Sequence, residues 1–328
     1  MTDPTPIRTT MIDTADLKRT FKTRTGPVEA VAGVDLHVTA GEIFGFLGPN
    51  GAGKTTTLRM LATLITPTAG EATVAGADLR RQPGLVRQRI GYVPQGGSTD
   101  PAETGRGELV IQGRLYGMNT ADAKSRATEV LAALDLDTAA DRPTGTYSGG
   151  MRRRLDVGLG IVHRPQVLFL DEPTTGLDPQ ARARMWEEIQ HLRELGTTVF
   201  LTTHYLEEAD ALCDRLAIID QGRIVTEGTS DELKRQVAGD VITIGVDGSR
   251  ERVVGLVAGL PFVREVGEEG DGLVRLYVER GETAMPQLLR FLDSANVVTI
   301  SIELHKPSLD DVFLRQTGRS LRDDAAAA

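Results

Sequence analysis

The segment Gly48–Thr56, with the sequence GPNGAGKTT, fits the phosphate-binding pattern G-x-x-x-x-G-K-[ST] at every position. The apolar run Ile43–Leu47 before it predicts a buried strand, and Thr57–Leu61 after it predicts the first turns of a helix. Glycines at the turns permit backbone angles at which successive N–H groups surround phosphates at a helix N-terminus. We therefore expect Lys54 to contact the β and γ phosphates of a nucleoside triphosphate and Thr55 to bind Mg²⁺. A glycine-rich turn with an incidental lysine is the alternative, which the flanking strand and helix disfavour.

The composition bounds the classes of partner. The chain has 328 residues, enough for one large domain and a smaller one. Its net charge of −9 disfavours a nucleic acid as partner. The single cysteine, Cys213, cannot form an internal disulfide, so a reducing cytoplasm is expected. No signal peptide is evident, and no apolar run approaches the roughly 18 residues of a membrane span, so any membrane role is expected to come through a partner.

Apolar periodicity predicts an α/β architecture for most of the chain. Alternating apolar positions within residues 11–47 indicate antiparallel strands beside the phosphate loop. Helices are predicted at Glu108–Tyr116 and Ala121–Leu134. Two apolar runs, Val167–Leu170 and Thr198–Thr202, predict buried parallel strands.

Beyond about Gly239 the pattern changes to short strands and two helices in the order β-α-β-β-α-β, which is typical of a ferredoxin-like unit. Ser308 and Asp311 have the spacing of a capping box for a last helix, whose residues 312–314 would offer apolar surface for docking. The predicted divisions are a disordered tail at 1–11, a nucleotide-binding domain at 12–238, an accessory domain at 239–320 and a disordered tail at 321–328.

Two carboxylates, Asp171 and Glu172, directly follow the predicted strand Val167–Leu170. Ligands of open parallel sheets bind at the carboxyl ends of the strands. Asp171 is therefore suited to Mg²⁺, and Glu172 to orienting an attacking water. An acidic turn after a core strand is the alternative for either residue alone.

Ser148 is a predicted helix N-cap followed by Gly149 and Gly150, which leave their amides unobstructed. The residues Arg152–Arg154 oppose the helix dipole, which favours a negative group docked at this helix start. A plain cap followed by a solvated basic face is the alternative.

Gln95 and His204 carry little signal alone, although each follows a predicted strand. A loop glutamine is usually solvated, and a lone histidine usually satisfies a local hydrogen bond. No other histidine has metal-ligand spacing from His204.

The order of the motifs GPNGAGKTT, YVPQ, YSGG, LFLDEP, TTGLDP and TTHY resembles the ATP-binding subunit of an ABC transporter over about residues 12–236. The resemblance implies ATP and Mg²⁺ as cofactors, with Phe21 stacking on adenine unless it is a core residue. Catalytic roles are implied for Lys54, Glu172 and His204, and Mg²⁺ contacts for Thr55, Gln95 and Asp171. The implied nucleotide contacts are Phe21, Gly48, Pro49, Asn50, Gly51, Ala52, Gly53, Lys54, Thr55, Thr56, Gln95, Ser148, Gly149, Gly150 and Asp178.

The finer resemblance is to daunorubicin/doxorubicin-type resistance exporters, which share YSGGMRRRLD and an ending similar to KPSLDDVFLRQTG. It implies an ATP hydrolase on the cytoplasmic face of the cell membrane that energises export of drugs or antibiotics through a separate integral membrane permease. It also implies a head-to-tail homodimer in which the helix start at Ser148, arginines included, faces the ATP of the other copy. Two departures are Tyr147 and Met151, which replace the usual leucine and glutamine of LSGGQ. A third departure is TGRGEL at Thr104–Leu109, where relatives usually have TGRENL. It affects the contacts that this helix start is implied to make with the membrane subunit.

Two other classes share parts of this motif set. A soluble ABC ATPase of DNA repair or translation would usually have a long coiled coil, or tandem domains with a basic surface, and this acidic chain has one motif set. A nucleotide sensor without turnover is disfavoured by Glu172. The accessory domain is expected to secure the homodimer or the permease contact, the alternative being an accessory fold that only stabilises the chain.

Overall fold

The computed structural model describes residues 9–237, 239–247, 250–268 and 273–318 and divides into two compact units, Met1–Ile224 and Val225–Ala328. Most of the predicted tails, at 1–8 and 321–328, lies outside the described residues. Strand β1 (Thr10–Thr23) pairs with β2 (Gly26–Thr39), and the first pair joins Thr10 to Thr39. Assigning residues 10 and 11 to a tail was therefore wrong, because they are part of a strand pair.

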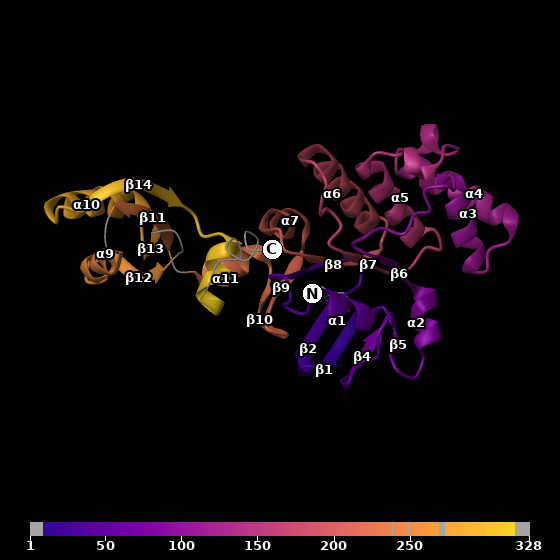
Figure 1. The fold of residues 1–328 in the computed structure, drawn as a ribbon, viewed down its shortest axis with the longest axis horizontal. Coiled ribbons are helices and arrows are strands. Elements are labelled where there is room, and N and C mark those ends of the chain that lie inside the picture. Colours follow the sequence, from indigo (N-terminus) through magenta and orange to yellow (C-terminus); the bar gives the residue numbers. More distant parts are fainter. Residues whose placement is uncertain (1–8, 238, 248–249, 269–272, 319–328) are drawn as a thin grey trace, which may run out of the picture. The chain divides into compact units, whose positions relative to one another are not determined.

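The first unit is built on a six-stranded sheet. Its strands are β3 (Ile43–Leu47), β6 (Ile90–Val93), β7 (Val167–Asp171), β8 (Thr198–Thr203), β9 (Arg215–Asp220) and β10 (Arg223–Gly228), and the helices that cover it include α1 (Lys54–Leu61), α5 (Gly149–Ile161) and α6 (Pro179–Glu194). The strand order is β10-β9-β3-β8-β7-β6, and the pairs from β9 to β6 are parallel. Figure 1 shows α1 on one side of this sheet and α5 and α6 on the other.

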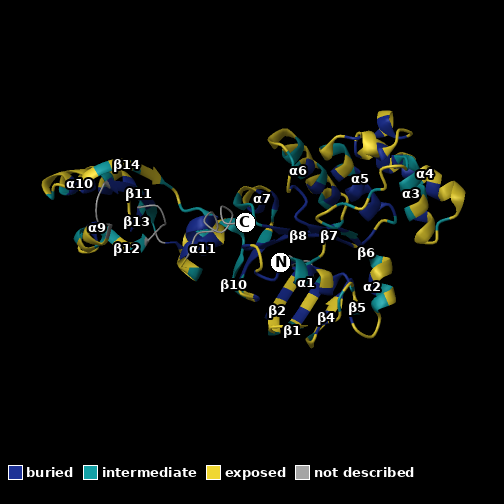
Figure 2. Ribbon diagram, viewed as in Figure 1, coloured by how far each residue is buried: buried dark blue, intermediate teal, exposed yellow. Residues whose placement is uncertain are grey.

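Side chains on the central strands alternate between two cores, because a strand has a period of two. Phe169 of β7 meets Phe200 of β8 in the core that includes α1, with ring centroids 5.7 Å apart. Its neighbours Leu168 and Leu170 face the other core, with side chains of α5 and α6. Burial on both faces explains why these strands are continuous apolar runs, and Figure 2 shows them buried throughout.

The rest of the first unit consists of an antiparallel sheet and a helical part. The sheet has the order β2-β1-β4-β5, where β4 is Ala69–Val74 and β5 is Ala77–Asp78. The helices α3 (Gly105–Leu115) and α4 (Thr120–Ala133) confirm two predictions, and Asn119 caps α4 by accepting a hydrogen bond from the Asp122 amide. No helix in the described ranges is long and apolar enough to cross a membrane. The remaining elements are α2 (Pro83–Arg89), α7 (Leu206–Leu212) and 3₁₀ turns at Asp137–Ala139 and Thr144–Thr146.

The second unit confirms the predicted β-α-β-β-α-β order. These six elements are β11 (Asp240–Asp247), α9 (Arg250–Val257), β12 (Val263–Glu268), β13 (Leu273–Val278), α10 (Gly281–Ser294) and β14 (Val298–His305). The strands form an antiparallel sheet in the order β12-β13-β11-β14, the arrangement of a ferredoxin-like fold. Helix α8 (Ser230–Gln236), which the sequence assigned to the first domain, lies in the second unit and packs against α11 (Leu309–Thr317).

The last helix begins as predicted but does not offer the predicted surface. Ser308 Oγ accepts a hydrogen bond from the Asp311 amide, and the Asp311 carboxylate accepts one from the Ser308 amide, which completes the capping box. Val312, Phe313 and Leu314 are all buried, so the apolar surface that was expected to dock is already covered within the chain. Their side chains pack inside the protein.

A buried ion cluster holds α11 to the sheet. Arg275 of β13 donates from Nη1 to Asp311 Oδ1 at 2.6 Å and from Nη2 to Asp310 Oδ2 at 3.1 Å. All three side chains are nearly or fully inaccessible to solvent. The acidic pair of the LDDVF segment is therefore an internal anchor.

Asp311→Ala is expected to lower the free energy of unfolding of the second unit by about 3–5 kcal/mol, because it removes a partner from a buried guanidinium. Urea unfolding measures the change. The control Asp293→Ala, on the exposed surface of α10, should stay within about 0.5 kcal/mol of wild type. Equal stability of the two variants would contradict the anchoring role.

Candidate functional site

The phosphate-binding loop connects β3 to α1 and lines a cavity of about 480 Å³. Gly51 and Gly53 have φ values of 81° and 107°, which favour glycine. A Cβ on Gly53 would lie 2.5 Å from the Ala30 carbonyl oxygen, and one on Gly48 would lie 2.3 Å from that of Ile219. Gly48 is therefore needed for close packing against β9 rather than for an unusual backbone angle.

Lys54 lies in the wall of this cavity with 4% of its surface exposed. Its Nζ donates to the carbonyl oxygens of Gly48 and Pro49, at 2.7 and 3.0 Å, and lies 3.7 Å from Glu172 Oε1. Burial lowers the pKa of Lys54, and the nearby carboxylates of Glu172 and Asp171 oppose that shift. A desolvated cation held by the loop is suited to attract phosphate oxygens.

Asp171 meets the conditions of a Mg²⁺ ligand. Its Oδ1 accepts hydrogen bonds from the hydroxyls of Thr55 and Thr202, both at 2.8 Å. The buried Oδ2 has no hydrogen-bond partner among the described residues. Oxygen ligands of this kind suit Mg²⁺, which is usually bound by one or two protein groups together with substrate phosphates and water. The described ranges contain no group of three or more His, Cys, Asp or Glu side chains that could hold a metal ion.

Glu172 is the residue on which the other candidates converge. Its Oε2 accepts hydrogen bonds from Gln95 Nε2 at 2.8 Å and from the Thr175 hydroxyl at 3.1 Å. His204 Nδ1 lies 3.2 Å from the same oxygen, without the alignment of a hydrogen bond. The backbone at Glu172 has a φ of 47°, unusual for a non-glycine residue, and its amide donates to Thr202 of β8.

The charges around Glu172 keep it ionised. Burial by itself raises the pKa of this carboxyl, but His204, Lys54 and Thr175 outweigh burial and lower the pKa. A charged form stabilised by hydrogen-bond donors and a cation can accept a hydrogen bond from water.

Ser148, Gly149, Gly150 and Asp178 lie in a different place. They line a second hollow, of about 380 Å³, that the phosphate-binding loop does not reach. Ser148 caps α5 as predicted, and its Oγ accepts a hydrogen bond from the Met151 amide at 3.2 Å. Asp178 caps α6 and accepts from the Ala181 amide. Within one copy of the chain, the predicted site residues therefore line two different hollows, each with part of the predicted set.

The structure corrects the expectation for Arg153, the second of the three arginines after Ser148. Arg153 is buried and donates only inward, to backbone carbonyls of its own chain. Arg152 donates to the Tyr147 carbonyl, and Arg154 to that of Leu134. The three guanidiniums are held by intrachain acceptors, so an anion is not needed to explain them.

Phe21 lies on β1, half-buried and outside the hydrophobic cores. The Arg19 guanidinium lies over its ring at 4.5 Å from the centroid. The alternative that Phe21 is a core residue is therefore wrong.

Sequence reasoning assigned no separate role to two residues of the site, Thr202 and Thr175, and it placed Arg153 in other surroundings. Thr202 is a buried polar residue near the end of β8, opposite Asp171 on the neighbouring strand, which was a usable signal. The contacts of Thr175 and Arg153 were not predictable, because they depend on how loops meet in three dimensions.

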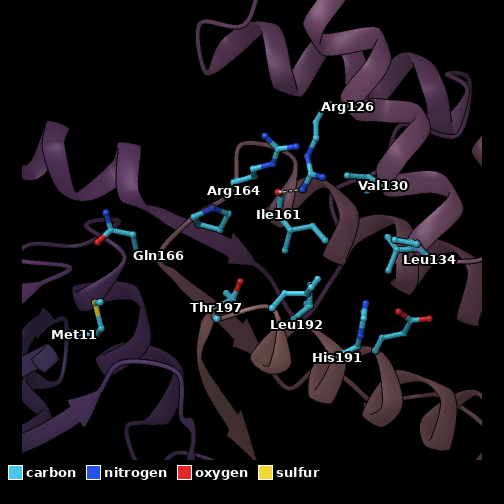
Figure 3. Close-up of a pocket in the computed structure, with 15 residues that line it drawn as sticks. Met11, Arg126, Val130, Leu134, Ile161, Arg164, Gln166, His191, Leu192 and Thr197 are labelled. Atoms are coloured by element: carbon cyan, nitrogen blue, oxygen red, sulfur yellow. Dashed lines mark hydrogen bonds between the residues drawn. The ribbon is translucent and has the colours of Figure 1, made fainter. Parts of the chain in front are cut away.

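A further cavity, of about 470 Å³, is lined mainly by side chains from α4, α6 and the end of α5 (Figure 3). Gln166 and Thr197 in its wall precede β7 and β8, so it lies at the amino ends of these strands. The residues around Glu172 lie at the opposite, carboxyl ends. The two sites are therefore distinct.

Both parts of the chain are similar in sequence to known protein families. Residues 31–175 match the ABC transporter family, and residues 228–317 match the family described as ATP-binding protein DrrA1-3-like, C-terminal domain. The chain is 47% identical over 305 residues to the daunorubicin resistance ATP-binding protein DrrA2 of Streptomyces coeruleorubidus, covering 92% of this chain and 95% of that protein. The chain belongs to the ABC transporter ATP-binding proteins.

Other comparisons agree. This ABC protein is 36% identical over 315 residues to the linearmycin resistance ATP-binding protein LnrL of Bacillus subtilis, covering 95% of this chain and 100% of that protein. A solved structure described as the ATP binding subunit of an ABC transporter has a TM-score of 0.61 and 26% identity, over 69% of this chain and 92% of that chain. The predicted resemblance and fold are confirmed, and the chain is an ABC-type ATP hydrolase.

Thr202→Val should lower the maximal ATPase rate of this ABC protein by roughly 10–100-fold, because a hydrogen bond to a charged group contributes about 1.5–3 kcal/mol. Steady-state hydrolysis at saturating Mg-ATP measures the loss. Thr198→Val is the matched control, since Thr198 is equally buried on β8 but accepts from the Gly41 amide at the other end of the strand. Equal rates for both variants would exclude a role for the Thr202 hydroxyl.

Proposed function

We propose that two copies of this ATPase bind Mg-ATP between them and hydrolyse it to drive export of a drug or antibiotic through a separate membrane permease. The observation that carries the chemistry is the convergence of Lys54, Gln95 and His204 on Glu172, beside the Thr55–Asp171 pair. Sites of this kind act by positioning and by electrostatic stabilisation of the transferred phosphoryl group.

In the proposed reaction Glu172 accepts a hydrogen bond from the attacking water, while Lys54 contacts the phosphate oxygens. Thr55, Asp171 and Gln95 would hold Mg²⁺, which when bound neutralises charge on the phosphates. Binding of phosphate would draw the Lys54 ammonium from the Glu172 carboxylate. Loss of that cation raises the pKa of Glu172 and makes it a better base when substrate is present.

His204, which directly follows β8, is proposed to contact the γ-phosphate. Its 3.2 Å separation from Glu172 Oε2 supports this placement. The amides of the phosphate-binding loop, from Gly48 to Thr56, would surround the phosphates.

Phe21 is proposed to stack on the adenine, because its residue is partly exposed near the β1–β2 turn, beyond the part of β1 that pairs with β4.

The separation of the two hollows that the predicted site residues line supports a head-to-tail homodimer. Ser148, Gly149, Gly150 and Asp178 line a hollow away from Lys54 and so would complete the site of the other copy. The helix N-terminus at Ser148 attracts negative charge. Closure around ATP would then couple the two copies and move the permease between inward-open and outward-open states.

The cargo and the permease are proposed from the relatives, whose names refer to resistance to daunorubicin and linearmycin. The protein would act at the cytoplasmic face of the cell membrane as a peripheral subunit. Purification of the tagged chain from detergent-solubilised membranes, trapped with ATP by Glu172→Gln, tests this. Recovery of no integral membrane protein would contradict a transport role and favour a soluble ABC ATPase.

The second unit is proposed to secure the homodimer or the permease contact. Because residues 312–314 are buried, exposed apolar side chains elsewhere in this unit must serve that role. Val298 and Ile300, on edge strand β14, are 63% and 71% exposed.

Glu172→Gln should retain ATP binding and lose hydrolysis by about 10²–10⁴-fold, the usual contribution of a general base. It should also accumulate as an ATP-bound dimer. Phosphate release and size-exclusion chromatography with ATP measure the two effects. Turnover at the wild-type rate would reject Glu172 as the base.

Lys54→Ala should instead weaken nucleotide binding, since it removes the charge that meets the phosphates. Equilibrium titration with a fluorescent ATP analogue measures the affinity. Lys124→Ala, an exposed charge on α4, is the control and should leave the affinity unchanged. Equal affinities for the two variants would mean that the loop is not the binding site.

A further inference from the structure

Helix α5 holds both ends of the loop that carries Gln95. Its residues Arg153 and Asp156 are three positions apart, so their side chains leave the helix on the same face. Both are charged and nearly inaccessible to solvent, at 7% and 4% exposure. Charged side chains are buried only where specific partners compensate the loss of water.

The Arg153 guanidinium joins two loops at the site. Its Nη1 donates to the Pro94 carbonyl oxygen at 2.6 Å, directly before Gln95. Its Nη2 donates to the carbonyl oxygens of Asp171 and Glu172, at 3.1 and 3.2 Å. A fourth bond runs from Nε to the Pro173 carbonyl oxygen at 2.7 Å. Only the planar fork of arginine supplies this many donors in fixed directions.

Asp156 holds the other end of the Gln95 loop. Its Oδ1 accepts hydrogen bonds from the Ser98 amide at 2.8 Å and the Ser98 hydroxyl at 3.1 Å. Gly97, with φ 75°, lies so close that an added Cβ would be 3.0 Å from Asp156 Oδ2. The segment from Pro94 to Ser98 is therefore attached to α5 on both sides of Gln95.

We propose that Arg153 and Asp156 are positioning residues for hydrolysis, which fix Gln95 and the Glu172 backbone to α5. Ser148 caps the start of helix α5. A movement of that helix start would therefore be transmitted to Glu172 through the Arg153 side chain and the two loops that it bonds. The backbone of Glu172 has an unfavourable φ, which persists only if surrounding groups hold it. Arg153 does so by donating to the carbonyl oxygen of Asp171, before Glu172, and to that of Glu172 itself. The inference rests on the proposed role of Glu172.

Arg153→Met keeps most of the side-chain volume and removes all four bonds. We expect kcat for Mg-ATP hydrolysis to fall by about 10–100-fold, since a misplacement of about 1 Å can cost about 10²-fold in rate. The affinity for a non-hydrolysable ATP analogue should change by less than about threefold, because Lys54 and Thr55 are not bonded to Arg153. Arg153→Lys, which keeps the charge without the fork, should recover only part of the rate.

Arg126→Met is the matched control. Arg126 also donates to two backbone carbonyls, of Val162 and Ile161, but at the other end of α5. Its loss should cost stability while leaving kcat within about threefold of wild type. Thermal unfolding of each variant ensures that rates are compared on folded protein, and Arg153→Lys serves if Arg153→Met does not fold.

A double variant tests whether Arg153 acts through the base. In protein that already carries Glu172→Gln, adding Arg153→Met should lower the rate of single-turnover hydrolysis by less than about twofold. The reason is that the effects of two substitutions are not additive when the two residues act as a unit. Full multiplication of the two losses would overturn the proposal, as would wild-type kcat in Arg153→Met or an equal loss of kcat in Arg126→Met. Wild-type turnover in Glu172→Gln alone would instead reject the proposed base, independently of Arg153.

Discussion

The buried charges at the carboxyl ends of β7 and β3 set the requirements for the rest of the first unit. Lys54, Asp171 and Glu172 are each at most 6% exposed, and such charges are tolerated only when paired and hydrogen-bonded. The hydroxyls of Thr55 and Thr202 meet that condition for Oδ1 of Asp171. The sheet supplies the geometry, because parallel strands bring these ends to one edge.

The same physical rule explains the second unit, where buried charges anchor a helix rather than perform chemistry. Arg275 is enclosed by Asp310 and Asp311 of α11, and the capping box begins that helix at Ser308. An acidic pair in a sequence therefore has no fixed meaning. After an apolar strand and beside a phosphate-binding loop it lies at the proposed catalytic site, and in a helix start over a sheet it forms an internal ion cluster.

Much of the site was predictable where the residues that act together are also adjacent in sequence. The phosphate-binding loop and the Asp171–Glu172 pair have strict spacing because each is a single turn after a strand. Gln95 and His204 were predictable only through the family resemblance, since a single polar residue after a strand has many ordinary uses. The sequence predicted that Arg153 faces an anion, whereas its guanidinium donates to backbone carbonyls of the same chain. The prediction considered the dipole of the helix end alone and not the loops that pack against it.

The sequence by itself determined the α/β architecture, the order of the second unit's strands and helices, the helix caps and the identity of the family. These properties follow from local rules: apolar period, turn residues and motif spacing. Only the tertiary structure decided that Ser148 lies apart from Lys54 within one copy, that Gln95 meets Glu172, and that Arg153 holds both loops. Those contacts join residues far apart in the chain, and their formation depends on how the sheet and helices pack, which no local pattern encodes.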